Sequence, residues 1–237
     1  MEISLKNITH HYQDGMGDQV TPLRNIDLTM RSGESLVLYG PSGCGKSTLL
    51  FILGCMLRPS EGEVDIDGRS VLRYGEKELA ELRNRRIGFM FQMCYLLPTL
   101  TVRENIMLPF WIQGGKTRDR GGEKKTVDLL LEQLELAERA DFLPYQLSGG
   151  QRRRVAMARA LANDPEMILA DEPTAELDEE KKDFVGKWLG EQAGKKKIVV
   201  AATHDPQLAA YAGKVYSLSQ GRLREKVLQK EIIRSSG

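Results

Sequence analysis

The chain has 237 residues, of which 41% are hydrophobic and 28% charged, and its formal net charge is +1. This composition excludes a disordered chain and a small disulfide-rich scaffold, and the length suits one domain with a substantial core. The charge balance argues against a dedicated nucleic-acid-binding protein, which usually carries a strong basic excess.

Two further features limit the setting in which the protein works. The longest charge-free stretch ends at Val102 and contains Gln92 and Pro98, so it is too short and too polar to span a bilayer as a helix. The N-terminus has no basic region followed by an apolar one, so we expect no secretory signal. The three cysteines, at positions 44, 55 and 94, match no common zinc spacing, and we expect them to be reduced, as in the cytosol.

Short apolar segments alternate with helical segments along the chain, which indicates an α/β fold with a parallel core sheet covered by helices. The predicted strands of this sheet cover residues 34–39, 87–91, 167–170 and 198–202, and a buried helix over 46–57 follows the first strand. Near the N-terminus, apolar residues alternate with polar ones, which predicts an antiparallel sheet beside the parallel one. The alternating residues are Ile3, Leu5, Ile26, Leu28, Met30, Val64 and Ile66.

Residues 93–164 have a mostly helical pattern. Val127, Leu130, Leu131 and Leu134 are spaced at i, i+3, i+4 and i+7, which defines one apolar helix face. We therefore expect a helical subdomain inserted between two strands of the parallel sheet. The whole chain, 1–237, is then one domain, in which 1–92 and 165–237 form the core with its antiparallel β-subdomain.

Residues 40–47 read Gly-Pro-Ser-Gly-Cys-Gly-Lys-Ser and match the phosphate-loop pattern G-x-x-x-x-G-K-[ST] between a strand and a helix. The glycines let backbone N–H groups point at phosphate oxygens, and the next helix offers its N-terminus to the anion. Lys46 is expected to reach the β- and γ-phosphates, and the Ser47 hydroxyl to ligate Mg²⁺. The expected nucleotide-binding residues here are Gly40, Pro41, Ser42, Gly43, Cys44, Gly45, Lys46, Ser47 and Thr48.

Two acids follow the apolar strand 167–170. Asp171 is placed to hold the Mg²⁺ shell through water, and Glu172 can orient or deprotonate an attacking water. A phosphate loop alone is shared by GTPases, kinases and motor ATPases, so this acidic pair narrows the choice of activity. A pair of solvated acids at a strand end is the alternative interpretation, and the phosphate loop argues against it.

The segment 147–151 reads Leu-Ser-Gly-Gly-Gln, and with it the chain resembles the ATPase cassette of the ABC transporter superfamily over nearly its whole length. Ser148, Gly149 and Gly150 form a loop that caps a predicted helix over 151–162, and this helix N-terminus is a second anion site. In the family, the γ-phosphate at this site is bound to the other subunit. The resemblance therefore implies that Ser148, Gly149, Gly150 and Gln151 bind ATP across a homodimer that sandwiches two ATP molecules.

Four more residues resemble functional positions of the family. Tyr12, predicted on a loop after the first strand, resembles an aromatic that stacks on adenine, which would contribute about 1–3 kcal/mol. Gln92 resembles the glutamine that senses Mg²⁺ and the attacking water. Asp178 resembles the aspartate that crosses the dimer interface, and His204 resembles the switch histidine that contacts the γ-phosphate. An ordinary packed tyrosine and a structural histidine at a strand end are the alternatives.

The segment 91–106 and the alanine before Asp171 are similar to the lipoprotein-release and macrolide-export branch of the family. This branch works with integral membrane permeases of the FtsX-like type, which implies a peripheral position on the cytoplasmic face of the inner membrane without insertion into it. Two residues depart from the pattern: Cys55 follows Gly54 where the branch often has two glycines, and Arg153 stands where many cassettes have glutamine.

Several alternatives stay open at this point. Importer cassettes for polar amino acids share much of the segment 91–106, and soluble ABC ATPases of translation or repair share the nucleotide motifs. A non-ABC phosphate-loop enzyme leaves residues 147–151 unexplained. The basic runs 152–154 and 195–197 are better read as solvated faces than as a nucleic-acid patch. The apolar residues within 93–100 are either core of the helical subdomain or a dock for a permease helix.

Overall fold

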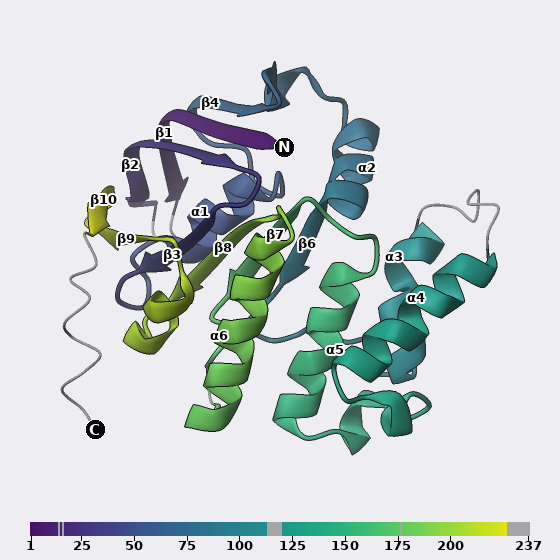
Figure 1. Ribbon diagram of the computed structural model, residues 1–237. Helices are drawn as coiled ribbons and strands as arrows, with labels where there is room; N and C mark the ends of the chain where they lie inside the picture. The colour runs from purple at the N-terminus through teal and green to yellow at the C-terminus, as the bar shows by residue number, and fades with distance from the viewer. Residues whose placement is uncertain (14, 16, 113–119, 176, 227–237) are drawn as a thin grey trace.

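The computed structural model describes the chain except residues 14, 16, 113–119, 176 and 227–237. It is an α/β fold with two sheets, and helices cover both faces of the larger sheet (Figure 1). The α/β class, the parallel core sheet and the antiparallel N-terminal sheet predicted from the sequence are confirmed. Within the described residues, no helix combines the length and the apolar character that crossing a membrane requires.

The larger sheet has the strand order β10-β9-β3-β8-β7-β6. Counted from the edge at β6, five neighbouring strands are parallel to one another: β6 (Ile87–Met90), β7 (Met167–Asp171), β8 (Ile198–Thr203), β3 (Ser35–Tyr39) and β9 (Lys214–Ser219). At the edge, β10 (Arg222–Lys226) pairs antiparallel with β9. Every residue of β7 and β8 is buried, which explains the continuous apolar runs of these two strands.

The antiparallel sheet has the order β2-β1-β4-β5, with β1 at Glu2–Gln13, β2 at Gln19–Arg31, β4 at Glu61–Ile66 and β5 at Arg69–Ser70. Ile3 lies opposite both Met30 and Ile66, so one apolar face runs across three strands. This face packs against α1 (Lys46–Leu53) in a core that also holds Leu38 and Val200 of the larger sheet. Helix α1 thus lies between the two sheets and carries the phosphate loop at its N-terminus.

The remaining helices are α2 (Glu76–Arg86), α3 (Val102–Ile112), α4 (Arg120–Gln133), α5 (Gly149–Leu161) and α6 (Glu179–Gly194), with 3₁₀ turns at Val71–Arg73, Ala137–Arg139, Pro144–Gln146 and Pro206–Tyr211. Helix α6 covers the face of the larger sheet opposite α1, and α3, α4 and α5 lie side by side beyond β6 (Figure 1). Val127 and Leu131 of the predicted apolar face are buried in the core that these helices share.

Two predicted element boundaries are wrong. Helix α1 ends at Leu53 rather than 57, because Cys55 takes a left-handed backbone with φ of 54°, a common way for a helix to end. Helix α5 starts at Gly149, two residues early, because the small residues after Ser148 are already helical. Helix α3 starts only at Val102, and the buried side chain of Asn105 holds the loop before it by hydrogen bonds to Leu97, Leu100 and Thr101.

At Gly88, strand β6 lies close against α5. A Cβ atom at this position would lie 2.2 Å from the carbonyl oxygen of Ala160. We expect Gly88→Ala to lower the free energy of unfolding by about 1–3 kcal/mol, because the strand or the helix must shift. Urea denaturation measures this. The matched control is Gly194→Ala, where an added Cβ would meet no heavy atom within 4 Å apart from its chain neighbours and the backbone of its own helix. There we expect a change below about 1 kcal/mol, and equal losses in both variants would contradict the packing argument.

Candidate active site

Ten of the predicted site residues meet at the carboxyl ends of the parallel strands. A pocket of about 330 Å³ opens there, between the end of β1 and the loops that follow β3, β6, β7 and β8. Open α/β sheets bind ligands at this edge. The predicted residues that line the pocket are Tyr12, Ser42, Gly43, Gly45, Lys46, Ser47, Thr48, Gln92, Glu172 and His204, together with Val20 and Pro22.

The phosphate loop curls because its glycines adopt conformations that other residues avoid. Gly43 has φ of 78° and Gly45 has φ of 106°, both in the left-handed region. A Cβ at Gly45 would also lie 2.7 Å from the carbonyl oxygen of Pro22. Gly45 is the N-cap of α1 and offers no side-chain acceptor, so the first N–H groups of this helix are left for an anion.

Lys46 is the buried cation of this site. It is 5% exposed, and its Nζ donates to the carbonyls of Gly40 at 2.8 Å and Pro41 at 3.1 Å. The same Nζ lies 3.3 Å from Oε1 of Glu172. The ammonium lies over the loop with two neutral carbonyls and one carboxylate as partners, and it can exchange the carbonyls for phosphate oxygens, which are stronger acceptors than neutral carbonyls.

Asp171 ends β7 and is 6% exposed. Burial, and secondarily the charge of Glu172, raise the pKa of the Asp171 carboxyl, while a hydrogen bond from Ser47 and the charge of Lys46 oppose the rise. Its Oδ1 is buried and has no hydrogen-bond partner. A buried carboxylate oxygen without a partner, beside a serine hydroxyl, fits a hydrated Mg²⁺ ion, which prefers oxygen ligands and keeps several waters.

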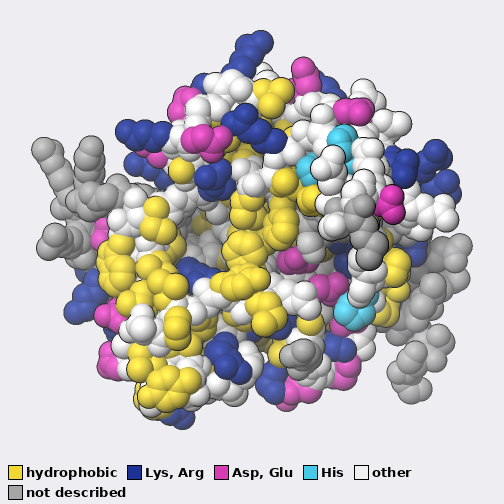
Figure 2. Space-filling model, turned by 180° about the vertical axis from the view of Figure 1, so that it is seen from behind, with side chains coloured by type: hydrophobic (Ala, Val, Ile, Leu, Met, Phe, Trp, Pro, Cys, Tyr) yellow, Lys and Arg dark blue, Asp and Glu magenta, His cyan; other side chains and the backbone are white. Residues whose placement is uncertain are grey.

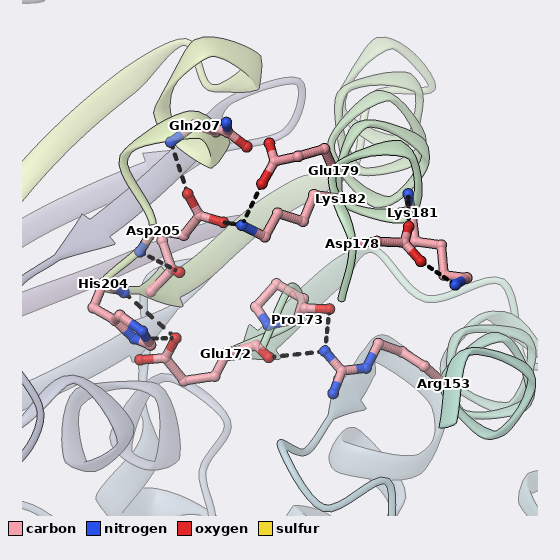
Figure 3. Close-up of polar contacts among 11 residues, drawn as sticks. Arg153, Glu172, Pro173, Asp178, Glu179, Lys181, Lys182, His204, Asp205 and Gln207 are labelled. Carbon is pink, nitrogen blue, oxygen red and sulfur yellow. Dashed lines mark hydrogen bonds and ion pairs between the residues drawn. The ribbon is translucent and has the colours of Figure 1, made fainter. Parts of the chain in front are cut away.

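Glu172 leaves the strand through a strained turn. Its φ is 45°, a left-handed conformation that is uncommon and costly for a residue other than glycine. Its N–H donates to the carbonyl of Ala202 on β8 at 2.9 Å. The carboxylate thereby lies between Lys46 and His204, whose Nδ1 is 3.0 Å from Oε2 (Figure 3). The His204 side chain is 60% exposed, so the pair faces the pocket.

Tyr12 lies within β1 rather than on a following loop, so this part of the prediction is wrong. The strand continues to Gln13 because β2 pairs with it as far as Gln19. The ring is 41% exposed, lines the pocket and packs edge-on against His10 at 4.5 Å. Its hydroxyl lies 3.4 Å from Oγ1 of Thr48. An exposed aromatic face at the rim of the pocket is available for a planar base.

The segment 147–151 lies elsewhere. Ser148 is the N-cap of α5, and its Oγ accepts from the N–H of Gln151 at 3.2 Å, while Gln151 accepts from the N–H of Ser148 at 2.9 Å. This capping box builds the helix N-terminus that the sequence predicts. The described residues that line the phosphate pocket include neither this segment nor Asp178. Asp178 instead caps α6 and pairs with Lys181 (Figure 3).

Two contacts at the site are not predicted by the sequence. Arg153 on α5 donates to the carbonyls of Glu172 and Pro173, and Lys182 on α6 joins Glu179 to Asp205, the residue after His204 (Figure 3). The only signal for Arg153 is its departure from the family pattern. Lys182 carries no signal, because lysines on exposed helix faces are common.

Comparison with known proteins agrees with this geometry. The family model described as "ABC transporter" matches residues 23–175. The lipoprotein-releasing system ATP-binding protein LolD of Geobacter metallireducens is 41% identical over 222 residues, which are 93% of this chain and 97% of that protein. The macrolide export ATP-binding/permease protein MacB of Rhodopseudomonas palustris is 43% identical over 219 residues, which are 92% of this chain and 33% of that protein.

A solved structure of similar fold is the dimeric, post-hydrolysis state of the ATP-binding cassette MJ0796 bound to ADP and Pi. It has a TM-score of 0.88 and 39% identity, and the match covers 96% of this chain and 99% of that chain. The cassette of this name comes from Methanocaldococcus jannaschii. The chain has a phosphate loop, an acidic pair and the segment 147–151 in a fold of this kind. It therefore belongs to the ABC transporter family and is the ATP-binding, ATP-hydrolysing subunit of an ABC transporter.

Proposed function

We propose that the chain works as an ATP-sandwich homodimer and powers a membrane permease of the FtsX-like type. The observation that supports a dimer is that one chain has two separate anion sites. Lys46 lines the phosphate pocket, whereas Ser148 caps the N-terminus of α5 outside that pocket. A head-to-tail dimer would bring the two sites together around one γ-phosphate. The dimeric state of the MJ0796 cassette with ADP and Pi supports this arrangement.

The proposed binding roles follow from the pocket. Tyr12 stacks on the adenine, and the loop 40–48 binds the phosphates through its N–H groups, with Lys46 on the β- and γ-phosphates. Residues 148–151 of the partner subunit close over the γ-phosphate. Asp178 contacts the partner across the interface. Bound between two chains, ATP is oriented and its phosphate charge is offset, and these are the main requirements for phosphoryl transfer.

The proposed chemistry centres on Glu172. Its carboxylate orients or deprotonates the attacking water, and His204 contacts the γ-phosphate from the end of the neighbouring strand. The distance of 3.0 Å between the two side chains supports a shared task. Lys46 offsets the charge that develops on the phosphoryl group, and Gln92 at the pocket wall senses both the water and the metal.

We assign Mg²⁺ to Ser47 and Gln92 directly and to Asp171 through water. The unpartnered Oδ1 of Asp171 supports this assignment, since a buried carboxylate oxygen is expected to have a partner. When bound, the ion supplies charge neutralisation on the β- and γ-phosphate oxygens.

Two observations support the proposed type of permease: the names of similar proteins, and an apolar surface that follows Gln92. The names of LolD and MacB, at 41% and 43% identity, place two similar proteins in lipoprotein release and macrolide export. In the segment after Gln92, Met93 and Tyr95 are 72% and 64% exposed. Tyr95 helps to line a groove of about 310 Å³, together with Leu108 and Ile112. Hydrophobic side chains gather on the corresponding face of the molecule (Figure 2).

We propose that this groove receives a coupling helix of the permease. An apolar groove with exposed aromatic and aliphatic rims is typical of helix-in-groove recognition. Leu96, in contrast, packs against the core. We therefore assign some apolar residues of this segment to the core of the helical subdomain and others to the permease dock. We further propose that residues 93–164 form a helical subdomain inserted into a core that consists of 1–92 and 165–237. The chain would then lie peripherally on the cytoplasmic face of the inner membrane.

Several cations of the basic runs 152–154 and 195–197 are engaged within the chain itself. Arg153 binds two backbone carbonyls within the chain, and Arg154 pairs with Glu135 and lies over the ring of Phe184 at 5.1 Å. Lys197 of the second run is buried and pairs with Asp164. Three of these six cations are therefore held by contacts within the protein, which argues against a continuous basic patch for the phosphates of a duplex.

Co-purification from membranes tests the partner. With the wild-type chain we expect an FtsX-like permease, and we expect Tyr95→Glu to reduce its recovery at least about tenfold, because a charge is buried in an apolar groove. The control is Tyr145→Glu, another tyrosine that is 74% exposed and lies outside the groove. Recovery of an importer permease would favour the amino-acid importer alternative, and recovery of no membrane protein would favour a non-transport ABC ATPase.

A further inference from the structure

We propose that Arg153 is a positioning residue for Glu172: its guanidinium holds the turn that aims the catalytic carboxylate at the pocket. The inference rests on the proposed role of Glu172. It concerns a residue that departs from the glutamine of many cassettes, so it describes how this chain in particular builds its site.

The contact of Arg153 joins helix α5 to the turn that follows β7. Arg153 comes from α5, and its Nη1 donates to the carbonyl oxygens of Glu172 at 3.3 Å and Pro173 at 2.6 Å (Figure 3). From the other side, the N–H of Glu172 donates to Ala202 on β8 at 2.9 Å. The peptide groups on both sides of the Glu172 Cα are therefore fixed, one by the sheet and one by the helix.

Glu172 needs this support because of its backbone. A left-handed residue other than glycine persists only where its surroundings impose the conformation. In an extended conformation, the side chain after Asp171 would point to the opposite face of the sheet. The left-handed turn instead directs the carboxylate to Lys46 and His204. Charge-assisted hydrogen bonds to the two carbonyls are strong enough to favour this turn.

The same helix also contacts the loop after Gln92. The Arg153 guanidinium also interacts with the side chain of Cys94 in this loop. Six residues further along α5, Arg159 donates to the carbonyls of Cys94 at 2.5 Å and Tyr95 at 2.8 Å. Arg153 thus lies where α5, the loop after β6 and the catalytic turn meet, and a shift of α5 would change the aim of Glu172.

Steady-state ATP hydrolysis by the full chain tests the proposal. We expect Arg153→Ala to lower kcat about tenfold with KM for ATP changed less than about twofold, because the loss affects placement of the attacking group and not ATP binding. Arg153→Lys should retain more activity, since one charged donor remains. The control is Arg154→Ala, which removes the same charge from the next residue of α5 but contacts Glu135 and Leu134 instead.

A double-variant comparison separates positioning from a general structural role. In a Glu172→Gln background, Arg153→Ala should lower the residual rate far less than tenfold, since both changes disable one unit. An equal loss in both backgrounds would overturn the proposal, as would an unchanged kcat or a loss that Arg154→Ala reproduces. If Glu172→Gln itself kept wild-type turnover, the proposed function of Glu172 would fail first, and this result is distinct from the others.

Discussion

Glu172→Gln is expected to abolish ATP turnover, by at least about a hundredfold, while ATP binding survives and the protein accumulates as an ATP-bound dimer. The amide occupies the space of the carboxylate between Lys46 and His204 but cannot take a proton from water. The binding residues, Lys46 and the phosphate loop, are unchanged. Phosphate release measures turnover, and gel filtration with Mg-ATP measures the dimer.

The control for this variant is Glu138→Gln, which removes the same charge from an exposed position outside the pocket and should hydrolyse ATP at the wild-type rate. Wild-type turnover by Glu172→Gln would refute the catalytic role. Loss of ATP binding along with turnover would show instead that the carboxylate serves mainly as the ion-pair partner of Lys46, 3.3 Å away.

Ser148→Arg is expected to stop hydrolysis while ATP still binds to Lys46 of the same chain. The large cation replaces the N-cap at the start of α5 and blocks approach to the γ-phosphate of the partner subunit. Mixing this variant with Lys46→Ala gives the sharpest result. Each heterodimer then has one site with an intact Lys46 from one chain and an intact Ser148 from the other, so two inactive proteins regain activity, with about a quarter of all sites intact in an equal mixture.

Ser148→Asp is the control for the effect of losing the helix cap. Aspartate keeps the side-chain acceptor that the N-cap requires, so folding is preserved, whereas its charge repels the γ-phosphate and hydrolysis should still fall. Thermal unfolding measures the first effect and phosphate release the second. If the mixture of Ser148→Arg and Lys46→Ala stayed inactive, although both variants dimerise, the site would not be shared between chains.

Much of the site can be predicted from the sequence because its residues lie in short contiguous segments. The phosphate loop needs glycines at positions with left-handed φ, as at Gly43 and Gly45, and a lysine directly after them. The capping box of Ser148 and Gln151 is likewise a local hydrogen-bond pattern. The central strands β7 and β8 are apolar throughout because both faces are covered.

Other elements escape prediction because packing, and not local pattern, defines them. Strands β9 and β10 carry polar residues and are stabilised by pairing with β3 and with each other at the sheet edge. Tyr12 belongs to a strand because β2 extends the pairing. The left-handed turn at Glu172 has no sequence signature, since glutamate normally avoids it.

From 237 residues and a net charge of +1, the sequence alone determined the family, the α/β fold and the chemistry, because a phosphate loop, an acidic pair and the segment 147–151 each need particular residue types at fixed spacing. Only the tertiary structure decided the relations between them. It brings Lys46, Glu172 and His204 within reach of one another from three strand ends, and it leaves the capped start of α5 outside their pocket. Such relations depend on contacts between residues far apart in the chain, for which local spacing holds no information.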